Sequence, residues 1–453
     1  MIKLGKVAIV SAVAIAGWPL FVQAQTGAGA DTQADTQTDE GRRRLEARVA
    51  ELERQLRELS EKMSAAPTPA RTATPPPADA PAIQVEPITP NAVPGTRFSY
   101  SGFIKFDALW SDYEDGEIAD GTIGRDFYLP SVIPVGGTSE GVDFDSHVKQ
   151  SRFIFGTDTD LANGRLLSSR FEVDLYGSSL GDERATNTYG VLLRHAYIQY
   201  GRWLVGQTWS NFMDAGALPE TADYIGPTDG TVFVREPQVR YTLGNWSFSA
   251  ENPETTITPF GGGTRIASDD NNVPDLTAAY TWKLGGGYLR AAALLRQLKY
   301  ETTGAGASKD TAEGAALSLS GKFNFGPHDL RFAITGGEGL GRYVGVNFVN
   351  DAVLTANGNL EAISGWAGFA AWRHVWSQQV RSTLMLSASE YDNDVLLTGG
   401  AVNKSSWSWA VNTFYSPVPK LDVGIELRGA EREIESGASG SMRRLHAVAR
   451  YSF

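Results

Sequence analysis

The 453-residue sequence contains no cysteine, which excludes disulfide frameworks, thiolate metal sites and cysteine nucleophiles. Only five histidines are present, and none of them is spaced as metal ligands are. The net charge of −12 argues against a nucleic-acid binder, which needs clustered Lys and Arg for phosphate contacts. The 49 glycines, 20 phenylalanines, 16 tyrosines and 11 tryptophans instead favour strands and turns. We therefore expect no enzyme, no cofactor and no bound metal.

Long apolar runs are also missing once the first residues are set aside. Residues 1–24 carry Lys3 and Lys6, an apolar run and a small-residue pattern ending at Ala24, which predicts a secretory signal peptide. No later stretch reaches the roughly 18 to 20 apolar residues that a spanning helix needs. A mature chain in a membrane must therefore span it as a closed barrel.

Three segments precede the main body of the chain. Residues 25–40 are small, polar and acidic, which predicts disorder. Residues 41–63 have apolar residues at 4-3-4-3-4 spacing, typical of a coiled-coil seam; these are Leu45, Val49, Leu52, Leu56, Leu59 and Met63. The alternative is one amphipathic helix folded back on a core. Residues 64–97 hold nine prolines in 34 residues, which indicates a semi-rigid linker.

From residue 98 to 453 the sequence alternates between apolar and polar residues in runs of about ten, the length of a tilted membrane strand. In "PKLDVGIELRG" the residues Val423, Ile425 and Leu427 alternate with Glu426 and Arg428. Short turns such as "LGN" and "FGPHD" alternate with long polar stretches at 112–147, 252–274 and 338–362. These features predict a transmembrane barrel of about 16 antiparallel strands. A soluble β-sandwich is the alternative, although mid-strand arginines beside Trp-rich strand ends disfavour it.

The chain ends with "RRLHAVARYSF", in which Tyr451 and Phe453 share the apolar face and Arg450 lies on the other. In a barrel, the last strand closes against the first, so we expect both rings to face lipid. An outward aromatic end also resembles the signal that the barrel assembly machinery of outer membranes reads.

The order of signal peptide, coiled coil, Pro-rich spacer and barrel resembles the DcaP-like trimeric porins of Gram-negative outer membranes. The segments "RHAYIQYGRWLVGQTWSNFMDAGALPE", "REPQVRYT" and "ARYSF" carry the resemblance. It implies a homotrimer with one pore per subunit, a periplasmic coiled coil, and uptake of small, often negatively charged solutes.

Residues 211–230 are too long and too rich in Pro and Gly for a turn. By position they resemble the loop that general porins fold inward to narrow the pore. We expect acids of this constriction loop near the narrowest point, namely Asp214, Glu220, Asp223 and Asp229. The alternative is an external loop whose acids are solvated.

In each predicted strand, alternate residues face the pore. The arginines assigned to this inward, pore-lining face are Arg152, Arg170, Arg194, Arg240, Arg290, Arg296 and Arg381. Guanidinium groups in a pore favour anions, although interleaved acids leave open a wall network with little selectivity. The same alternation turns His195 toward lipid or a neighbouring subunit. The nine acids from Asp112 to Asp145 belong to a loop expected to point outward, toward lipopolysaccharide.

Together these patterns predict an outer-membrane porin for passive diffusion of small, preferentially anionic, dicarboxylate-like solutes. A phosphate-selective porin and a structural envelope tether are the alternatives, and an outer-membrane hydrolase is the enzymatic one. The expected partners are two further copies of the chain, outer-membrane lipid with lipopolysaccharide, and the barrel assembly machinery.

Overall fold

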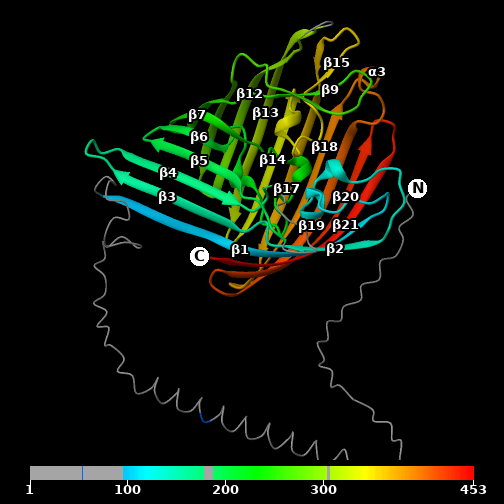
Figure 1. Ribbon diagram of the computed structural model, residues 1–453. Helices are drawn as coiled ribbons and strands as arrows, with labels where there is room; N and C mark the ends of the chain where they lie inside the picture. Colours follow the sequence, from blue (N-terminus) through cyan, green and yellow to red (C-terminus); the bar gives the residue numbers. More distant parts are fainter. Residues whose placement is uncertain (1–53, 55–94, 178–186, 304–306) are drawn as a thin grey trace, which may run out of the picture. The chain divides into compact units, whose positions relative to one another are not determined.

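A computed structural model of the protein describes Arg54 and residues 95–177, 187–303 and 307–453 (Figure 1). The chain divides into two compact units, Met1–Ala80 and Pro81–Phe453. Of the first unit only Arg54 is described, in helical backbone. The predicted signal peptide, disordered segment, coiled-coil seam and nearly all of the linker lie outside the described residues and stay predictions. Among the described residues, no helix is both long and apolar enough to cross a membrane.

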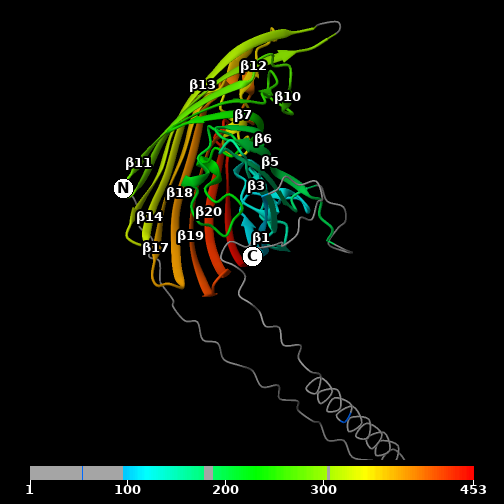
Figure 2. The same ribbon diagram turned by 90° about the vertical axis from the view of Figure 1, so that its left-hand side faces the viewer.

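The second unit is a closed antiparallel β-barrel (Figures 1 and 2). Its first strands are β1 (Thr96–Tyr113), β3 (Arg152–Asp160), β4 (Leu166–Asp174), β5 (Leu192–Tyr200), β6 (Trp203–Trp209), β7 (Arg235–Leu243) and β8 (Trp246–Glu251). The others are β11 (Asp275–Leu284), β12 (Gly287–Glu301), β13 (Lys309–Phe325), β14 (His328–Glu338), β17 (Ser364–Val375), β18 (Val380–Asp392), β19 (Asn403–Val418), β20 (Leu421–Ile434) and β21 (Ser439–Ser452).

A further strand, β2 (Val142–His147), continues β3, because both pair with β1 along different parts of its length. With β2 and β3 counted as one, 16 barrel strands are formed by the described residues, and β21 pairs with β1 to close the ring. The predicted barrel of about 16 antiparallel strands is confirmed.

The alternating sequence pattern puts apolar side chains outside the barrel and polar ones inside. On β20, Val423, Ile425 and Leu427 are 46–49% exposed, whereas Glu426 and Arg428 between and beside them are buried. A soluble protein would hide the first set and expose the second. An apolar outer belt around a polar interior is the arrangement of an outer-membrane barrel.

Short turns join the strands at one end of the barrel. The β7–β8 turn has Gly244 at φ +61° and the β13–β14 turn has Gly326 at φ +62°, a left-handed conformation that glycine adopts without steric cost. The strands at the other end are joined by the long connections. The predicted contrast between short turns and long loops is therefore confirmed.

The long connections do not all point outward, which corrects the expectation for residues 112–147 and 338–362. They contain short helices and 3₁₀ turns, namely α2 (Ile123–Asp126), η1 (Pro130–Val132), η2 (Ala215–Ala217), η3 (Thr228–Gly230), η4 (Gly341–Tyr343) and α3 (Val395–Thr398). Phe127, Tyr128 and Ile133 of the first loop are at most 3% exposed, because they pack against the inner wall and the other inward segments.

Four short strands from two of these connections form a separate small sheet in the order β10-β9-β15-β16. They are β9 (Thr255–Thr258), β10 (Ile266–Ser268), β15 (Ala352–Leu354) and β16 (Leu360–Ala362). Ile257 and Ala352 pack there against Leu298 of β12, so the small sheet rests on the extended end of that strand (Figure 1).

The C-terminus lies at the seam of the barrel. The Phe453 ring stacks on Tyr100 with centroids 5.2 Å apart, and its backbone N–H donates to the Gly102 carbonyl at 3.0 Å. Tyr451 is 53% exposed on the outer face, while Arg450 reaches inward to Asp422 at 2.7 Å. The geometry agrees with a closing strand, and the role of the two rings as an assembly signal stays a prediction.

Candidate functional site

The β6–β7 connection, residues 210–234, lies inside the barrel. Its η3 turn hydrogen-bonds the inner wall where the Gly230 N–H donates to the Ser387 hydroxyl at 2.8 Å. Further along the wall, Glu426 of β20 accepts from the Ala222 N–H at 2.9 Å and from the Thr221 hydroxyl at 2.7 Å. The segment thus contacts β18 and β20, which favours the predicted inward loop over the alternative of a solvated external loop.

Two acids of this constriction loop are held by different strands of the wall, Asp214 by β12 and β13 and Glu220 by β18. Asp214 accepts from the Tyr288 hydroxyl at 3.0 Å and from the Ser320 hydroxyl at 2.8 Å. Glu220 forms a two-pronged ion pair with Arg381, both N···O distances being 2.7 Å. These carboxylates therefore anchor the loop, and the charge of Glu220 is compensated by Arg381, whereas the wall groups that donate to Asp214 are neutral hydroxyls.

Two further acids join the constriction loop to the first long connection. Asp223 accepts from the Tyr128 N–H at 2.9 Å, and Asp229 accepts from the Tyr128 hydroxyl at 2.5 Å. Asp229, which has no exposed surface, also accepts from Ser406 and Ser408 of β19. Burial and the neighbouring carboxylate raise the pKa of Tyr128, so its hydroxyl stays protonated and donates.

Three of the predicted arginines gather around one carboxylate, Glu172 of β4. Arg194 lies 3.0 Å, Arg152 3.4 Å and Arg170 2.6 Å from its oxygens. The Arg170 side chain is 41% exposed, whereas that of Arg194 is 3% exposed and also pairs with Asp174 at 2.8 Å. Arg194 therefore has little surface to offer a solute, which corrects its assignment to the pore lining.

A bulge in β5 overturns the expectation that His195 faces lipid. The register shifts so that Glu172 pairs with His195 and Val173 with Leu193, which leaves Arg194 as an extra residue. Both Arg194 and His195 then turn inward and are buried. His195 contacts the Thr208 hydroxyl through Nδ1 at 2.9 Å.

Arg296 is likewise not part of the pore lining. Its side chain has no exposed surface and pairs with Asp275 at 3.0 Å and with Asp351 at 2.6 Å. It also donates to the Gly339 and Glu254 carbonyls, so it ties β12 to two long connections. Arg296 therefore fits the alternative in which arginines pair with interleaved acids in the barrel wall and contribute little to selectivity.

Arg240 and Arg290 differ from the other predicted arginines. Arg240 donates to the Gln238 side chain and to the Trp209 carbonyl, and Arg290 donates to the Asn211 carbonyl. Among the described residues, the acceptors of these two guanidinium groups are carbonyl and side-chain amide oxygens, not carboxylates. Their charges are therefore less compensated than that of Arg381, which pairs with Glu220 and with Asp422 at 2.9 Å.

Comparison with known proteins agrees with this geometry. A model of the DcaP outer membrane protein family matches residues 136–453. The chain belongs to the DcaP outer membrane protein family. A search of curated proteins found no relative.

Two solved structures show how far the likeness extends. The crystal structure of the outer membrane channel DcaP of Acinetobacter baumannii superposes with a TM-score of 0.65 at 24% identity, covering 80% of this chain and 99% of that one. The Salmonella typhi OmpF complex with daunomycin gives a TM-score of 0.49 at 12% identity, covering 79% and 98%. The likeness to the Acinetobacter channel establishes that the two chains share the barrel fold.

The sequence reasoning missed a second group of cations in this DcaP-family barrel. Asp329 of β14 lies 2.7 Å from Arg331, 2.6 Å from Arg373 and 4.0 Å from Lys322. The side chains of Lys322 and Arg373 are 27% and 28% exposed. The "FGPHD" turn could have revealed the group, because pairing across it aligns Lys322 with Arg331.

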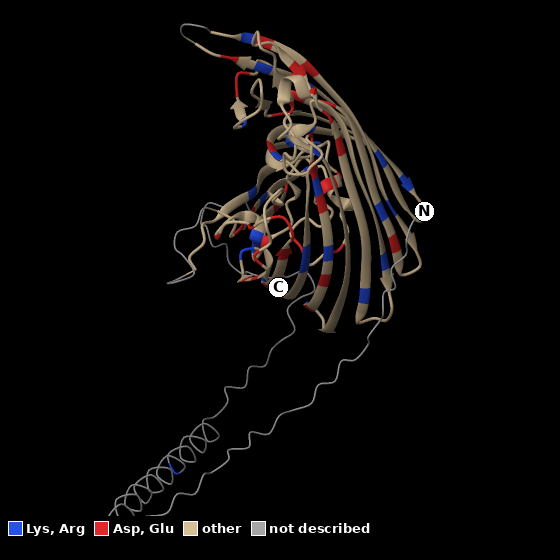
Figure 3. Cartoon of the chain, turned by 90° about the vertical axis from the view of Figure 1, so that its right-hand side faces the viewer, with Lys and Arg blue, Asp and Glu red and all other residues tan. Residues whose placement is uncertain are grey.

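This group lies on the inner wall near the short turns. Figure 3 shows Lys and Arg recurring along the barrel strands toward that end. Arg331 also donates to the Leu218 carbonyl, so the group touches the constriction loop. Three cations around one carboxylate leave a local excess of positive charge beside the loop that crosses the DcaP-family barrel.

Proposed function

We propose that the chain is a homotrimeric outer-membrane porin whose pores pass small hydrophilic solutes, with a preference for anions such as dicarboxylates. The observation that carries the anion preference is the set of Lys322, Arg331 and Arg373 around the single carboxylate of Asp329. Partly exposed cations on a low-dielectric wall lower the entry barrier for anions, and guanidinium groups match carboxylates in geometry. Arg290 on β12, which pairs with β13, and Arg240 on β7 add further positive charge that is less compensated than that of Arg381.

Removing two of these charges is expected to weaken anion preference. Lys322→Gln with Arg373→Gln keeps the Arg331–Asp329 pair and the contact to Leu218, so the constriction loop stays anchored. We expect the reversal potential across a potassium chloride gradient to indicate anion selectivity in the wild type, with the permeability ratio reduced by about threefold or more in the variant.

Arg443→Gln serves as the matched control, since this side chain is 75% exposed and pairs with Glu114 away from the inner wall. Its reversal potential should equal that of the wild type. Cation selectivity of the wild type would refute the proposal. Block of the current by a dicarboxylate, compared with a monocarboxylate and with inorganic phosphate, tests the solute class.

The lengths of the strands support the homotrimer. Strands β3 to β8 contain 6 to 9 residues, at or below the roughly 9 to 11 that a tilted strand needs to cross a bilayer. Their outer face nevertheless exposes Phe155, Phe171 and Ile198. An apolar wall too short for a full bilayer needs another apolar cover, and a neighbouring subunit supplies one.

A spin-label experiment tests this arrangement, because the chain has no cysteine of its own. A nitroxide on Ile198→Cys of β5 should be shielded from oxygen dissolved in lipid, whereas one on Leu386→Cys of β18 should be accessible. Both side chains are more than half exposed in a single chain, at 57% and 55%, so the pair is matched. Equal accessibility at the two positions, or a monomeric mass in detergent, would exclude the proposed contact.

A further inference from the structure

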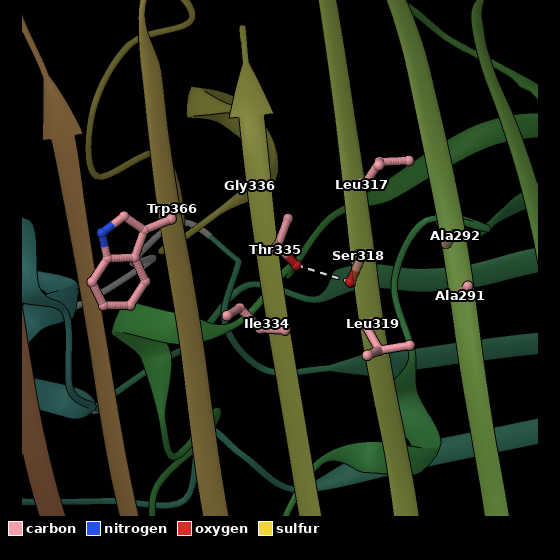
Figure 4. Close-up of a pocket in the computed structure, with 9 residues that line it drawn as sticks. All are labelled: Ala291, Ala292, Leu317, Ser318, Leu319, Ile334, Thr335, Gly336 and Trp366. Atoms are coloured by element: carbon pink, nitrogen blue, oxygen red, sulfur yellow. Dashed lines mark hydrogen bonds between the residues drawn. The ribbon is translucent and has the colours of Figure 1, made fainter.

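The outer face of β12, β13, β14 and β17 has an apolar hollow of about 450 Å³ (Figure 4). The outward residues that line it are Ala291, Leu317, Leu319, Ile334, Gly336 and Trp366. Leu317 is 68% and Ile334 53% exposed, so the hollow opens outward. The hydrogen bond between Thr335 and Ser318, 2.9 Å long, lies behind it.

The hollow exists because one cross-strand row lacks a side chain. The register aligns Leu317 with Gly336 and Gly336 with Trp366, so a glycine lies between two large residues. A Cβ added at Gly336 would meet no atom closer than 3.6 Å. The backbone therefore does not require glycine here, and the space above it is free for a ligand.

The position along the strands places the hollow near a membrane boundary. Glu338, two residues beyond Gly336, pairs with Ser364, and Ser364 pairs with Asp392, so the outer face turns polar toward the long-loop end. A second, polar hollow of about 630 Å³ lies there and shares Trp366 with the first. A tryptophan between apolar and polar surface is typical of the membrane interface.

We propose that the apolar hollow seats an acyl chain of lipopolysaccharide, with the headgroup at the level of the polar hollow. The strands beneath it contain 11 to 17 residues, enough to cross the hydrocarbon layer, so this wall meets lipid. The long loops put the hollow in the outer leaflet, and the acids above it suit the divalent cations that accompany lipopolysaccharide phosphates. This assignment rests on the proposed trimer, whose contact uses the short-stranded wall.

Gly336→Leu tests the proposal by filling the hollow, and Ala370→Leu enlarges an exposed residue of the same outer face that does not line it. Native mass spectrometry of trimers extracted from outer membranes in mild detergent counts the bound lipopolysaccharide. Excluding two methylene groups lowers affinity about tenfold, so Gly336→Leu should retain far less lipid than wild type and Ala370→Leu. If Gly336→Leu does not fold, Ala291→Leu fills the same hollow from β12.

The proposal would be overturned if every variant retained as much lipid as the wild type. It would also be overturned if Gly336→Leu and its control Ala370→Leu lost lipid equally. A disulfide between copies carrying Gly336→Cys would show that a second chain covers the hollow, which also overturns it. Conductance and reversal potential recorded on the same preparations separate the proposed lipid site from the proposed anion-selective pore. Lipid retention can be lost while anion selectivity is intact, and anion selectivity can be absent while lipid is retained.

Discussion

Replacing Arg296 with methionine is expected to destabilise the barrel by about 3 to 5 kcal/mol, the usual cost of removing one partner from a buried ion pair. Asp275 and Asp351 would remain without exposed surface and without their main counter-charge. Tyr343 and Thr256 still donate to them, at 2.9 Å and 2.8 Å, which compensates only part of the loss. Thermal unfolding followed by circular dichroism measures the effect, and protease cleavage of the small sheet measures local loosening.

Arg443→Met is the control for Arg296, because its ion pair with Glu114 is exposed and contributes little. The double variant Arg296→Met with Asp351→Leu should regain part of the lost stability, since it also removes one buried unpaired carboxylate. A midpoint shift no larger than that of Arg443→Met would show that the buried network is not a source of stability.

The barrel itself could be predicted because lipid outside and water inside require every strand to alternate apolar and polar residues with a period of two. Val423, Ile425 and Leu427 face outward while Glu426 and Arg428 face inward, and in a membrane a closed barrel satisfies both faces of such strands. The bulge at Arg194 could not be predicted, because it depends on how two strands pair and not on either strand alone. One extra residue was enough to reverse the side on which His195 lies.

The sequence contained a signal that the first long connection turns inward, but its many acids led to the prediction of an outward loop. The run "FYLPSVI", residues 127–133, is too apolar for a solvated loop. In the structure Phe127 and Leu129 pack with Ile225 of the constriction loop, and Arg125 pairs with Asp145 at 3.1 Å. The net acidity of a loop therefore says less about its location than the distribution of its apolar residues.

Replacing Asp229 with alanine is expected to loosen the η3 segment of the constriction loop and to produce larger, noisier channel currents. Asp229 joins three parts of the interior, since Tyr128 of the first connection and Ser406 and Ser408 of β19 all donate to it. Hydrogen bonds to a charged acceptor contribute about 1.5 to 3 kcal/mol each. After their loss, the Tyr128 and Ser406 hydroxyls keep only their mutual contact at 3.4 Å, and the Ser408 hydroxyl loses its acceptor. Single-channel recording in planar bilayers measures the mean conductance and the frequency of transitions.

Asp229→Asn should behave between wild type and Asp229→Ala, because the amide keeps one acceptor oxygen but loses the charge. Asp269→Ala, which removes an exposed acid from another long connection, should leave the current unchanged. Because the loop is also held by Glu220 and by the Thr221 contact to Glu426, the segment around η3 should loosen first and the remainder stay attached. A quiet, wild-type current from Asp229→Ala would mean that those other anchors suffice, and that the carboxylate does not set the width of the pore.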